Sequence, residues 1–270
     1  SGAAVAIPAT ELIEVAGVRL RVSIHGSGRP LLLLNGIGAA LELLEPFRRA
    51  LRSTESIALD APGTGGSGTT RFPLLLRGLS GLVARALDAL GYDRVDVLGV
   101  SWGGALAQEF ALRHRRRVRR LVLAATTPGW ASVPGRLEAI RALATPRRYT
   151  SPEYFEKVAP ILYGGAIRAN PRLLREHAHL RFIRPPSGRG YYWQLLAGTG
   201  WTSVPWLHRI HRPALVLAAD DDPIVPLVNA RWMARRLPQG RLHVVPNGGH
   251  LFLVTHAEEI AAVVESFLAE

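Results

Sequence analysis

One serine stands in a sequence context that suits it to attack a carbonyl carbon. Gly99-Val100-Ser101-Trp102-Gly103 fits the pattern G-x-S-x-G and directly follows an apolar stretch at residues 95–99. Residues 101–113 have helical spacing, so the serine would occupy a sharp turn between a strand and a helix. Such a turn presents a hydroxyl at the carboxyl edge of a sheet, and the flanking glycines relieve its crowding. We therefore predict a nucleophile at Ser101, in preference to a serine that only caps a helix.

A serine hydroxyl needs a base that takes its proton, and histidine is the usual one. Of the nine histidines, only His250 lies in a glycine-rich loop, at residues 247–250, directly after the last predicted strand. His243 alternates within that strand. The remaining candidates in arginine-rich or polar helical stretches are interpreted as surface or structural residues: His114, His177, His179, His208 and His211. His250 is therefore the predicted base.

The histidine in turn needs a carboxylate that fixes its tautomer. Asp220, Asp221 and Asp222 all follow the penultimate predicted strand. We favour Asp222, because its distance from Pro226 gives the pattern D-x-x-x-P that is common at this turn, and we interpret its two neighbours as loop-forming or solvated. The resulting order along the chain, serine then aspartate then histidine, is that of α/β hydrolases.

Attack on an ester creates an oxyanion, which backbone N–H groups can stabilise. The amide of Trp102, next to the nucleophile at a helix N-terminus, is one predicted donor. The turn Asn35-Gly36-Ile37-Gly38 offers the other, which we assign to Ile37. Asn35 and Gly36 are expected to support this turn.

Other kinds of site lack their motifs. Residues 60–67 are rich in glycine, but they lack the lysine and the Ser/Thr spacing of a phosphate-binding loop, so we interpret them as a structural turn. No group of His, Asp and Glu has the spacing of metal ligands, and residues 220–222 lack the glycine and glutamate positions of a calcium loop. The chain contains no cysteine. We expect no metal and no cofactor.

The elements that must position these residues follow an alternating pattern. An antiparallel hairpin is predicted at residues 11–24. Strands are then predicted at residues 31–34, 56–59, 95–99, 121–124, 214–218 and 242–245. Helices are predicted at residues 40–51, 73–90, 101–113, 227–237 and 257–269. This order predicts an α/β protein with a mostly parallel twisted sheet flanked by helices.

The alternation stops between residues 127 and 212, where prolines are frequent and the apolar spacing is helical. We predict a helical lid there, inserted into a core made of residues 1–126 and 213–270. The insertion is rich in aromatic residues: Tyr191, Tyr192, Trp193, Trp201 and Trp206. We predict that the first four bind substrate by lining an apolar cleft; the alternative is that they form the core of the lid itself.

Composition limits the partners. The net charge is +12, but arginine is spread over the whole chain and no nucleic-acid-binding motif accompanies it, so we interpret it as a solvated surface. The apolar runs are far shorter than the ~20 residues of a membrane span. Residues 1–10 have no basic start, which favours a soluble protein whose signal peptide is absent or removed.

With these residues assigned, the chain resembles the intracellular medium-chain-length polyhydroxyalkanoate depolymerases, a bacterial family of α/β hydrolases. The resemblance is carried by residues 31–47 (LLLLNGIGAALELLEPF), 95–108 (VDVLGVSWGGALAQ), 190–203 (GYYWQLLAGTGWTS), 220–227 (DDDPIVPL) and 250–254 (HLFLV). These segments span nearly the full length and include the insertion.

The resemblance implies an α/β-hydrolase fold and hydrolysis of ester bonds in polyesters of 3-hydroxy fatty acids. It implies that Ser101, Asp222 and His250 form the triad, and it implies a cytoplasmic location at the surface of storage granules; secretion stays open. The alternatives are an esterase, lactonase or carbon–carbon bond hydrolase acting on small molecules with the same triad, and a non-catalytic granule-binding protein.

Overall fold

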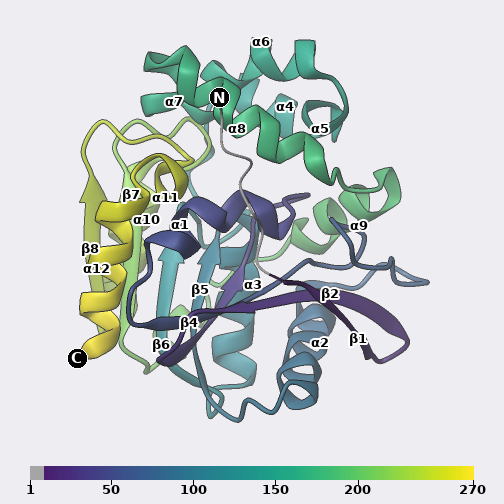
Figure 1. Cartoon of the computed structure of the whole chain (residues 1–270). Coiled ribbons are helices and arrows are strands. Elements are labelled where there is room, and N and C mark those ends of the chain that lie inside the picture. Colours follow the sequence, from purple (N-terminus) through teal and green to yellow (C-terminus); the bar gives the residue numbers. More distant parts are fainter. Residues whose placement is uncertain (1–8) are drawn as a thin grey trace.

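The computed structural model of the protein describes residues 9–270, and eight strands within them form one sheet in the order β1-β2-β4-β3-β5-β6-β7-β8 (Figure 1). The strands are β1 (Glu11–Val15), β2 (Val18–His25), β3 (Arg29–Leu34), β4 (Thr54–Leu59), β5 (Val95–Val100), β6 (Val118–Ala124), β7 (Ala214–Ala219) and β8 (Gly240–Val245). β2 pairs antiparallel with β1 and β4, and all other pairs are parallel. The sheet is thus mostly parallel, with the predicted hairpin at its edge.

Helices cover both faces of the sheet. They are η1 (Leu41–Leu44), α1 (Glu45–Ala50), α2 (Leu76–Ala89), α3 (Trp102–Arg113), α10 (Leu227–Arg236), α11 (Phe252–Thr255) and α12 (Ala257–Ala269). Leu32 and Leu34 of β3 pack in the cluster with α2, α3 and α10, whereas Leu31 and Leu33 pack in the cluster with α1, α11 and α12. Both alternating sets of a covered strand must be apolar, which explains the unbroken leucine run.

One predicted helix is divided. The stretch at residues 40–51 forms the 3₁₀ helix η1 followed by the α-helix α1. Pro46 lies in the first turn of α1, where its missing N–H costs nothing. Proline cannot donate to the carbonyl of Glu42, so a continuous α-helix would lack one of its hydrogen bonds at this point, which favours the break.

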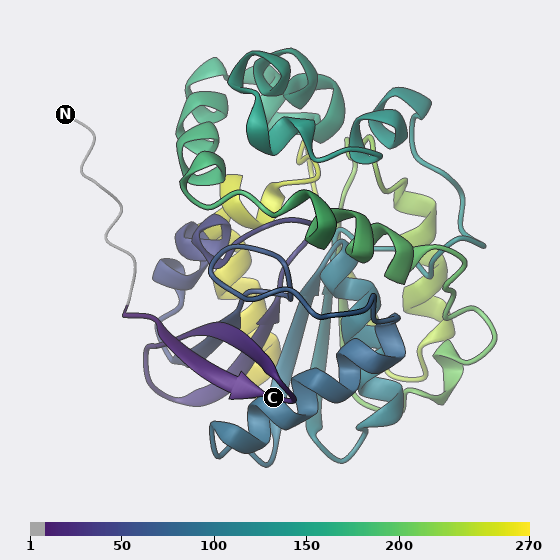
Figure 2. The same cartoon turned by 90° about the vertical axis from the view of Figure 1, so that its right-hand side faces the viewer.

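Residues 127–212, which we call the lid, lie between β6 and β7. Their helices are α4 (Leu137–Leu143), α5 (Arg147–Thr150), α6 (Pro152–Tyr163), α7 (Gly165–Ala169), α8 (Pro171–Ile183), α9 (Gly188–Gly198) and η2 (Leu207–Arg209). Figures 1 and 2 show α4 to α8 gathered over one end of the sheet. The lid has a small core of its own, built around Phe155, Ala159 and Leu162.

Glycines allow the lid to approach the core closely. A Cβ on Gly63 would overlap the backbone of Gly190 in α9, and a Cβ on Gly38 would overlap the rings of Tyr149 and Tyr191. The glycine-rich loop that precedes α2 is therefore a contact surface for the lid.

The expectation about a signal peptide concerns residues 1–10, and residues 1–8 lie outside the part of the chain that the structure describes. Among residues 9–270, no helix is long and apolar enough to cross a membrane.

Candidate active site

Ser101 occupies the sharp turn between β5 and α3. Its backbone has φ 54° and ψ −118°, a combination that costs a non-glycine residue about 1–3 kcal/mol. The turn is crowded: a Cβ on Gly99 would overlap the carbonyl oxygen of Gly103, and a Cβ on Gly103 would overlap that of Leu34. The Ser101 N–H donates to the Ala124 carbonyl at 2.9 Å, which anchors the strained residue to β6.

The structure brings Ser101, His250 and Asp222 together in series, from three separate loops. His250 Nε2 lies 3.0 Å from Ser101 Oγ, and His250 Nδ1 lies 2.7 Å from Asp222 Oδ2. The side chains of His250 and Asp222 are only 7% and 2% exposed. With Nδ1–H donating to the carboxylate, Nε2 presents a lone pair to the serine hydroxyl, which is the tautomer that general-base catalysis requires.

The three neighbouring aspartates have different surroundings. Asp222 Oδ1 accepts from the N–H groups of Ile224 and Val225 at 2.8 and 3.0 Å, so its free oxygen Oδ2 is aimed at His250. Asp221 instead pairs with Arg168 and accepts from the Gly165 N–H at 2.8 Å, both in α7 of the lid. Asp221 is therefore a link between core and lid, a role that its position in the sequence does not reveal.

The turn at Asn35 lies beside the nucleophile. Asn35 Oδ1 accepts from the Gly36 N–H at 2.8 Å, and its Nδ2 donates to the Ala40 carbonyl at 2.9 Å. A Cβ on Gly36 would lie 3.7 Å from the Ser101 Cβ, so the backbone of this turn adjoins the reactive hydroxyl. Ile37 follows and lines the same cavity.

Trp102 has a second contact besides its place at the start of α3. Its indole Nε1–H donates to the carbonyl of Gln194 in α9 at 2.8 Å, and the Gln194 side chain accepts from the Gly38 N–H at 2.8 Å. Trp102, one predicted oxyanion donor, and Gly38, which follows the other donor Ile37, thus contact the same lid residue.

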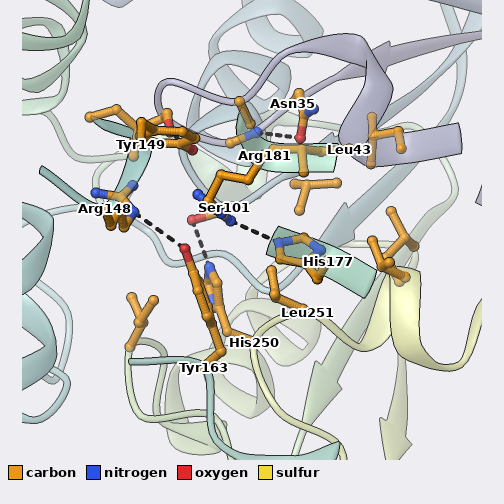
Figure 3. A pocket seen from close by; sticks show the side chains of 18 of the residues that line it. Asn35, Leu43, Ser101, Arg148, Tyr149, Tyr163, His177, Arg181, His250 and Leu251 are labelled. Atoms are coloured by element: carbon orange, nitrogen blue, oxygen red, sulfur yellow. Dashed lines mark hydrogen bonds between the residues drawn. The ribbon is translucent and has the colours of Figure 1, made fainter. Parts of the chain in front are cut away.

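Figure 3 shows the cavity into which Ser101 and His250 point. Its empty volume is about 560 Å³, the open solvent at its mouth included. Apolar residues form much of its wall: Ile37, Ala39, Leu43, Leu44, Val100, Leu143, Ile224, Leu251, Leu253 and Val254. The lid contributes five polar or aromatic side chains: Arg148, Tyr149, Tyr163, His177 and Arg181.

None of the four predicted aromatic substrate-binding residues is among those that line this cavity. Tyr191 is fully buried, its hydroxyl donates to the Leu143 carbonyl at 2.6 Å, and burial raises its pKa to about 12. Tyr192 is half exposed. Trp193 lies under the guanidinium of Arg189.

Trp201, the fourth, packs against Trp206 and donates to Glu109 Oε2 at 3.0 Å. Trp201 thus joins the second half of the lid to α3 of the core, whereas the Tyr191 hydroxyl bonds to the first half of the lid.

Sequence reasoning missed the residues that the lid does contribute. His177 is 4% exposed and lines the cavity, although its arginine-rich helix suggested a surface or satisfied structural residue. Burial, with the positive charge of Arg181 beside it, lowers the pKa of His177 well below its ordinary value. The i, i+4 spacing of these two residues places them on one face of α8, and that spacing was the only signal in the sequence.

Among residues 9–270, no group of three or more His, Cys, Asp or Glu side chains is arranged to hold a metal ion. The chemistry that the site offers is that of a serine nucleophile with an oriented base.

Comparison with known proteins gives three consistent findings. The sequence profile described as alpha/beta hydrolase fold matches residues 29–257. The chain is 51% identical over 242 residues to the poly(3-hydroxyalkanoate) depolymerase of Ectopseudomonas oleovorans, covering 89% of this chain and 84% of that protein. It is 29% identical over 278 residues to the 2-hydroxymuconate semialdehyde hydrolase of Pseudomonas putida, covering 96% and 93%.

Among solved structures, the enol-lactonase from Burkholderia xenovorans LB400 matches with a TM-score of 0.82 and 23% identity, covering 96% of this chain and 100% of that one. At this identity the likeness concerns the fold alone. The α/β-hydrolase fold predicted from the sequence is confirmed.

Proposed function

Because the chain belongs to the α/β-hydrolase family, and within it to the poly(3-hydroxyalkanoate) depolymerases, we propose that it hydrolyses ester bonds in polyesters of 3-hydroxy acids with side chains of medium length. The observation that carries the proposal is the hydrogen-bonded series Ser101, His250 and Asp222 at the wall of a largely apolar cavity.

The reaction proceeds through an acyl-enzyme. Ser101 Oγ attacks the ester carbonyl while His250 Nε2 takes its proton, and the N–H groups of Ile37 and Trp102 stabilise the oxyanion, each by about 3 kcal/mol. His250 then gives the proton to the departing alkoxide. A water molecule, deprotonated by His250, releases the acyl group as a carboxylic acid, and Asp222 stabilises the imidazolium in both halves.

Residues 127–212 act as a lid over this site. The hydrogen bonds of Asp221 to Gly165 and of Trp102 to Gln194 support this role, because they tie the lid directly to the catalytic loops. The leucine and isoleucine side chains of the cavity wall suit the alkyl side chain of a medium-length hydroxy acid.

An insoluble polymer must be met at its surface, and the lid is the most apolar part of the surface. Of the 14 large hydrophobic residues that are exposed within residues 9–270, eight lie in the lid: Trp130, Val133, Leu137, Ile140, Ile161, Ile183, Tyr192 and Leu196. We infer that these residues contact the polyester, which agrees with action in the cytoplasm at the surface of storage granules.

The first test is release of hydroxy acids from a suspension of medium-chain-length polyhydroxyalkanoate, measured beside a short-chain polymer and p-nitrophenyl esters. We expect the protein to clear the medium-chain polymer, and Ser101→Ala to reduce turnover on the order of 10⁴-fold or more.

Ser27→Ala, in an exposed loop, is the matched control and should keep full activity. Activity on soluble esters alone would support an esterase or lactonase in place of a depolymerase. Binding to polymer without any turnover would support a granule-binding protein.

A further inference from the structure

Two arginines of the lid are buried without a carboxylate. Arg148 and Arg181 are 2% and 3% exposed and both line the cavity of Ser101 (Figure 3). Within the described part of the chain, no carboxylate oxygen lies within 4.0 Å of either guanidinium. A guanidinium keeps its charge in proteins, and a buried charge is costly unless it is paired.

The protein pairs its other buried arginines. Arg21 binds both Glu42 and Asp60, each at 2.6 Å, and Arg48 binds Glu45 at 2.6 Å. The absence of a carboxylate is therefore particular to the two arginines at the cavity.

Arg148 is held by neutral oxygens. Its Nε donates to the Tyr163 hydroxyl at 3.2 Å, and its Nη1 donates to the Tyr191 hydroxyl at 2.5 Å and the Thr145 carbonyl at 3.3 Å. These bonds fix the position of the guanidinium, but they leave its charge without a counterion.

Arg181 has two donors without any partner. Its Nη2 lies 2.9 Å from His177 Nε2, while Nε and Nη1 are buried and make no hydrogen bond. The rings of Tyr149, Phe155 and Tyr163 surround the guanidinium, with centroids 4.5 to 5.2 Å from its central carbon. Aromatic faces attract a cation and hold it in place, yet they accept no hydrogen bond of ordinary strength.

His177 adds a further donor. A guanidinium can only donate, so His177 Nε2 must accept from Arg181, and the proton of the neutral ring is on Nδ1. Nδ1 is also buried and without a partner. Two positive charges and three donor nitrogens without a hydrogen-bond partner thus lie at the cavity, and the described part of the chain supplies no acceptor for them.

We propose that Arg148, His177 and Arg181 form a binding site for the free carboxylate of a 3-hydroxy acid beside Ser101. This inference rests on the proposed function and specifies its substrate. A polyester chain is neutral along its length, so the carboxylate at its end is the only anion that it presents. The same group occurs on each hydroxy acid that hydrolysis releases. The site therefore binds the carboxyl end of a chain, the released acid, or both.

The first arm of the test compares two substrates that differ in whether the carboxyl group at one end is charged or methylated. They are the linear dimer of 3-hydroxyoctanoate as the free acid and as its methyl ester, with cleavage of the bond between the two units followed by chromatography. We expect kcat/KM to be at least about tenfold higher for the free acid. Arg181→Gln should bring this ratio close to one.

Arg175→Gln, on the exposed side of the same helix α8, should preserve the ratio. A ratio taken within one variant cancels any general loss of activity or of folded protein, so a poorly folding Arg181→Gln would not obscure the result. A preference for the free acid that persists in Arg181→Gln would overturn the assignment.

The second arm tests the released acid as a competitive inhibitor of p-nitrophenyl octanoate hydrolysis, with its methyl ester as the neutral counterpart. Inhibition by the acid without a preference in the dimers identifies the released acid as the ligand; a preference in the dimers identifies the chain end. Neither effect, in protein that still hydrolyses p-nitrophenyl octanoate, overturns the site. Failure of the proposed function would appear differently, as no hydrolysis of any ester or no effect of Ser101→Ala.

Discussion

At the scale of single residues, what matters at Asp222 is which atoms its two oxygens contact. Oδ1 is occupied by the N–H groups of Ile224 and Val225, and Oδ2 faces His250 Nδ1. Asp221, one position earlier, has a side chain that is 29% exposed, against 2% for Asp222, and it faces Arg168 in the lid. The same substitution, aspartate to asparagine, can thus be made at two adjacent positions, and its expected effect on kcat differs between them.

We expect Asp222→Asn to lower kcat about 10⁴-fold on a soluble ester, because an amide does not stabilise the imidazolium and allows the wrong tautomer. Its carbonyl can still accept from Ile224 and Val225, so the melting temperature should change little. Asp221→Asn should keep kcat within a few-fold. Equal losses of kcat in the two variants would show that Asp222 does not orient His250.

Local patterns identified some residues of the site and not others. Ser101 lies between Gly99 and Gly103, His250 follows Gly249, and these glycines, which the turns require, are visible in the sequence. Arg148 and Arg181 have no such neighbours. Their position depends on how the helices of the lid pack over the sheet, and no local pattern encodes that packing.

At the scale of elements, one side chain joins the last helix to the sheet. Glu265 in α12 accepts from the N–H groups of Arg52 and Ser53 at 2.9 and 2.7 Å and from the Thr54 hydroxyl at 2.8 Å. Partial burial alone would raise the pKa of Glu265, but the hydrogen bonds from Ser53, Thr54 and Arg52 hold it below its ordinary value.

A carboxyl whose pKa is lowered on folding stabilises the protein above its unfolded pKa, about 4.3 for glutamate, and loses that effect as the pH falls through the lower folded value. We expect Glu265→Gln to reduce the free energy of unfolding by about 1–2 kcal/mol at pH 7, and the difference from the unmodified protein to shrink below about pH 4. Urea unfolding at pH 7 and at pH 3 measures the free energy of unfolding of both proteins.

Glu258→Gln is the control, because Glu258 lies in the same helix, is highly exposed and forms only a 3.6 Å ion pair with Arg52. Its effect should be close to zero at either pH. An effect of Glu265→Gln that is the same at pH 7 and pH 3 would contradict a role of its charge.

The elements themselves were largely predictable, because buried parallel strands and amphipathic helices have distinct apolar spacing. The exception at residues 40–51 has a local cause in Pro46, which helical spacing alone does not weigh. In the lid, the spacing of apolar residues predicted helices, but it did not indicate which face of each helix packs against the core.

At the scale of the whole molecule, the core and the lid differ in what their surfaces expose. Of the exposed large apolar side chains within residues 9–270, eight lie in the lid and six in the core. Trp130, at 69% exposed, is the most exposed of them. It does not line the cavity of Ser101, so contact with the polymer can be separated from the chemical step.

We expect Trp130→Ser to weaken binding to particles of medium-chain-length polyester about tenfold, since burial of one large apolar side chain contributes about 1.5–3 kcal/mol. Trp232→Ser, which removes a 36% exposed tryptophan from α10 in the core, is the matched control and should bind normally. Sedimentation of the protein with particles measures binding, and hydrolysis of p-nitrophenyl octanoate measures the chemical step.

If Trp130→Ser bound particles as well as the control, the lid would not be the face that contacts the polymer. If instead it lost hydrolysis of the soluble ester in the same proportion, the side chain would act through the catalytic cavity and not through the polymer surface.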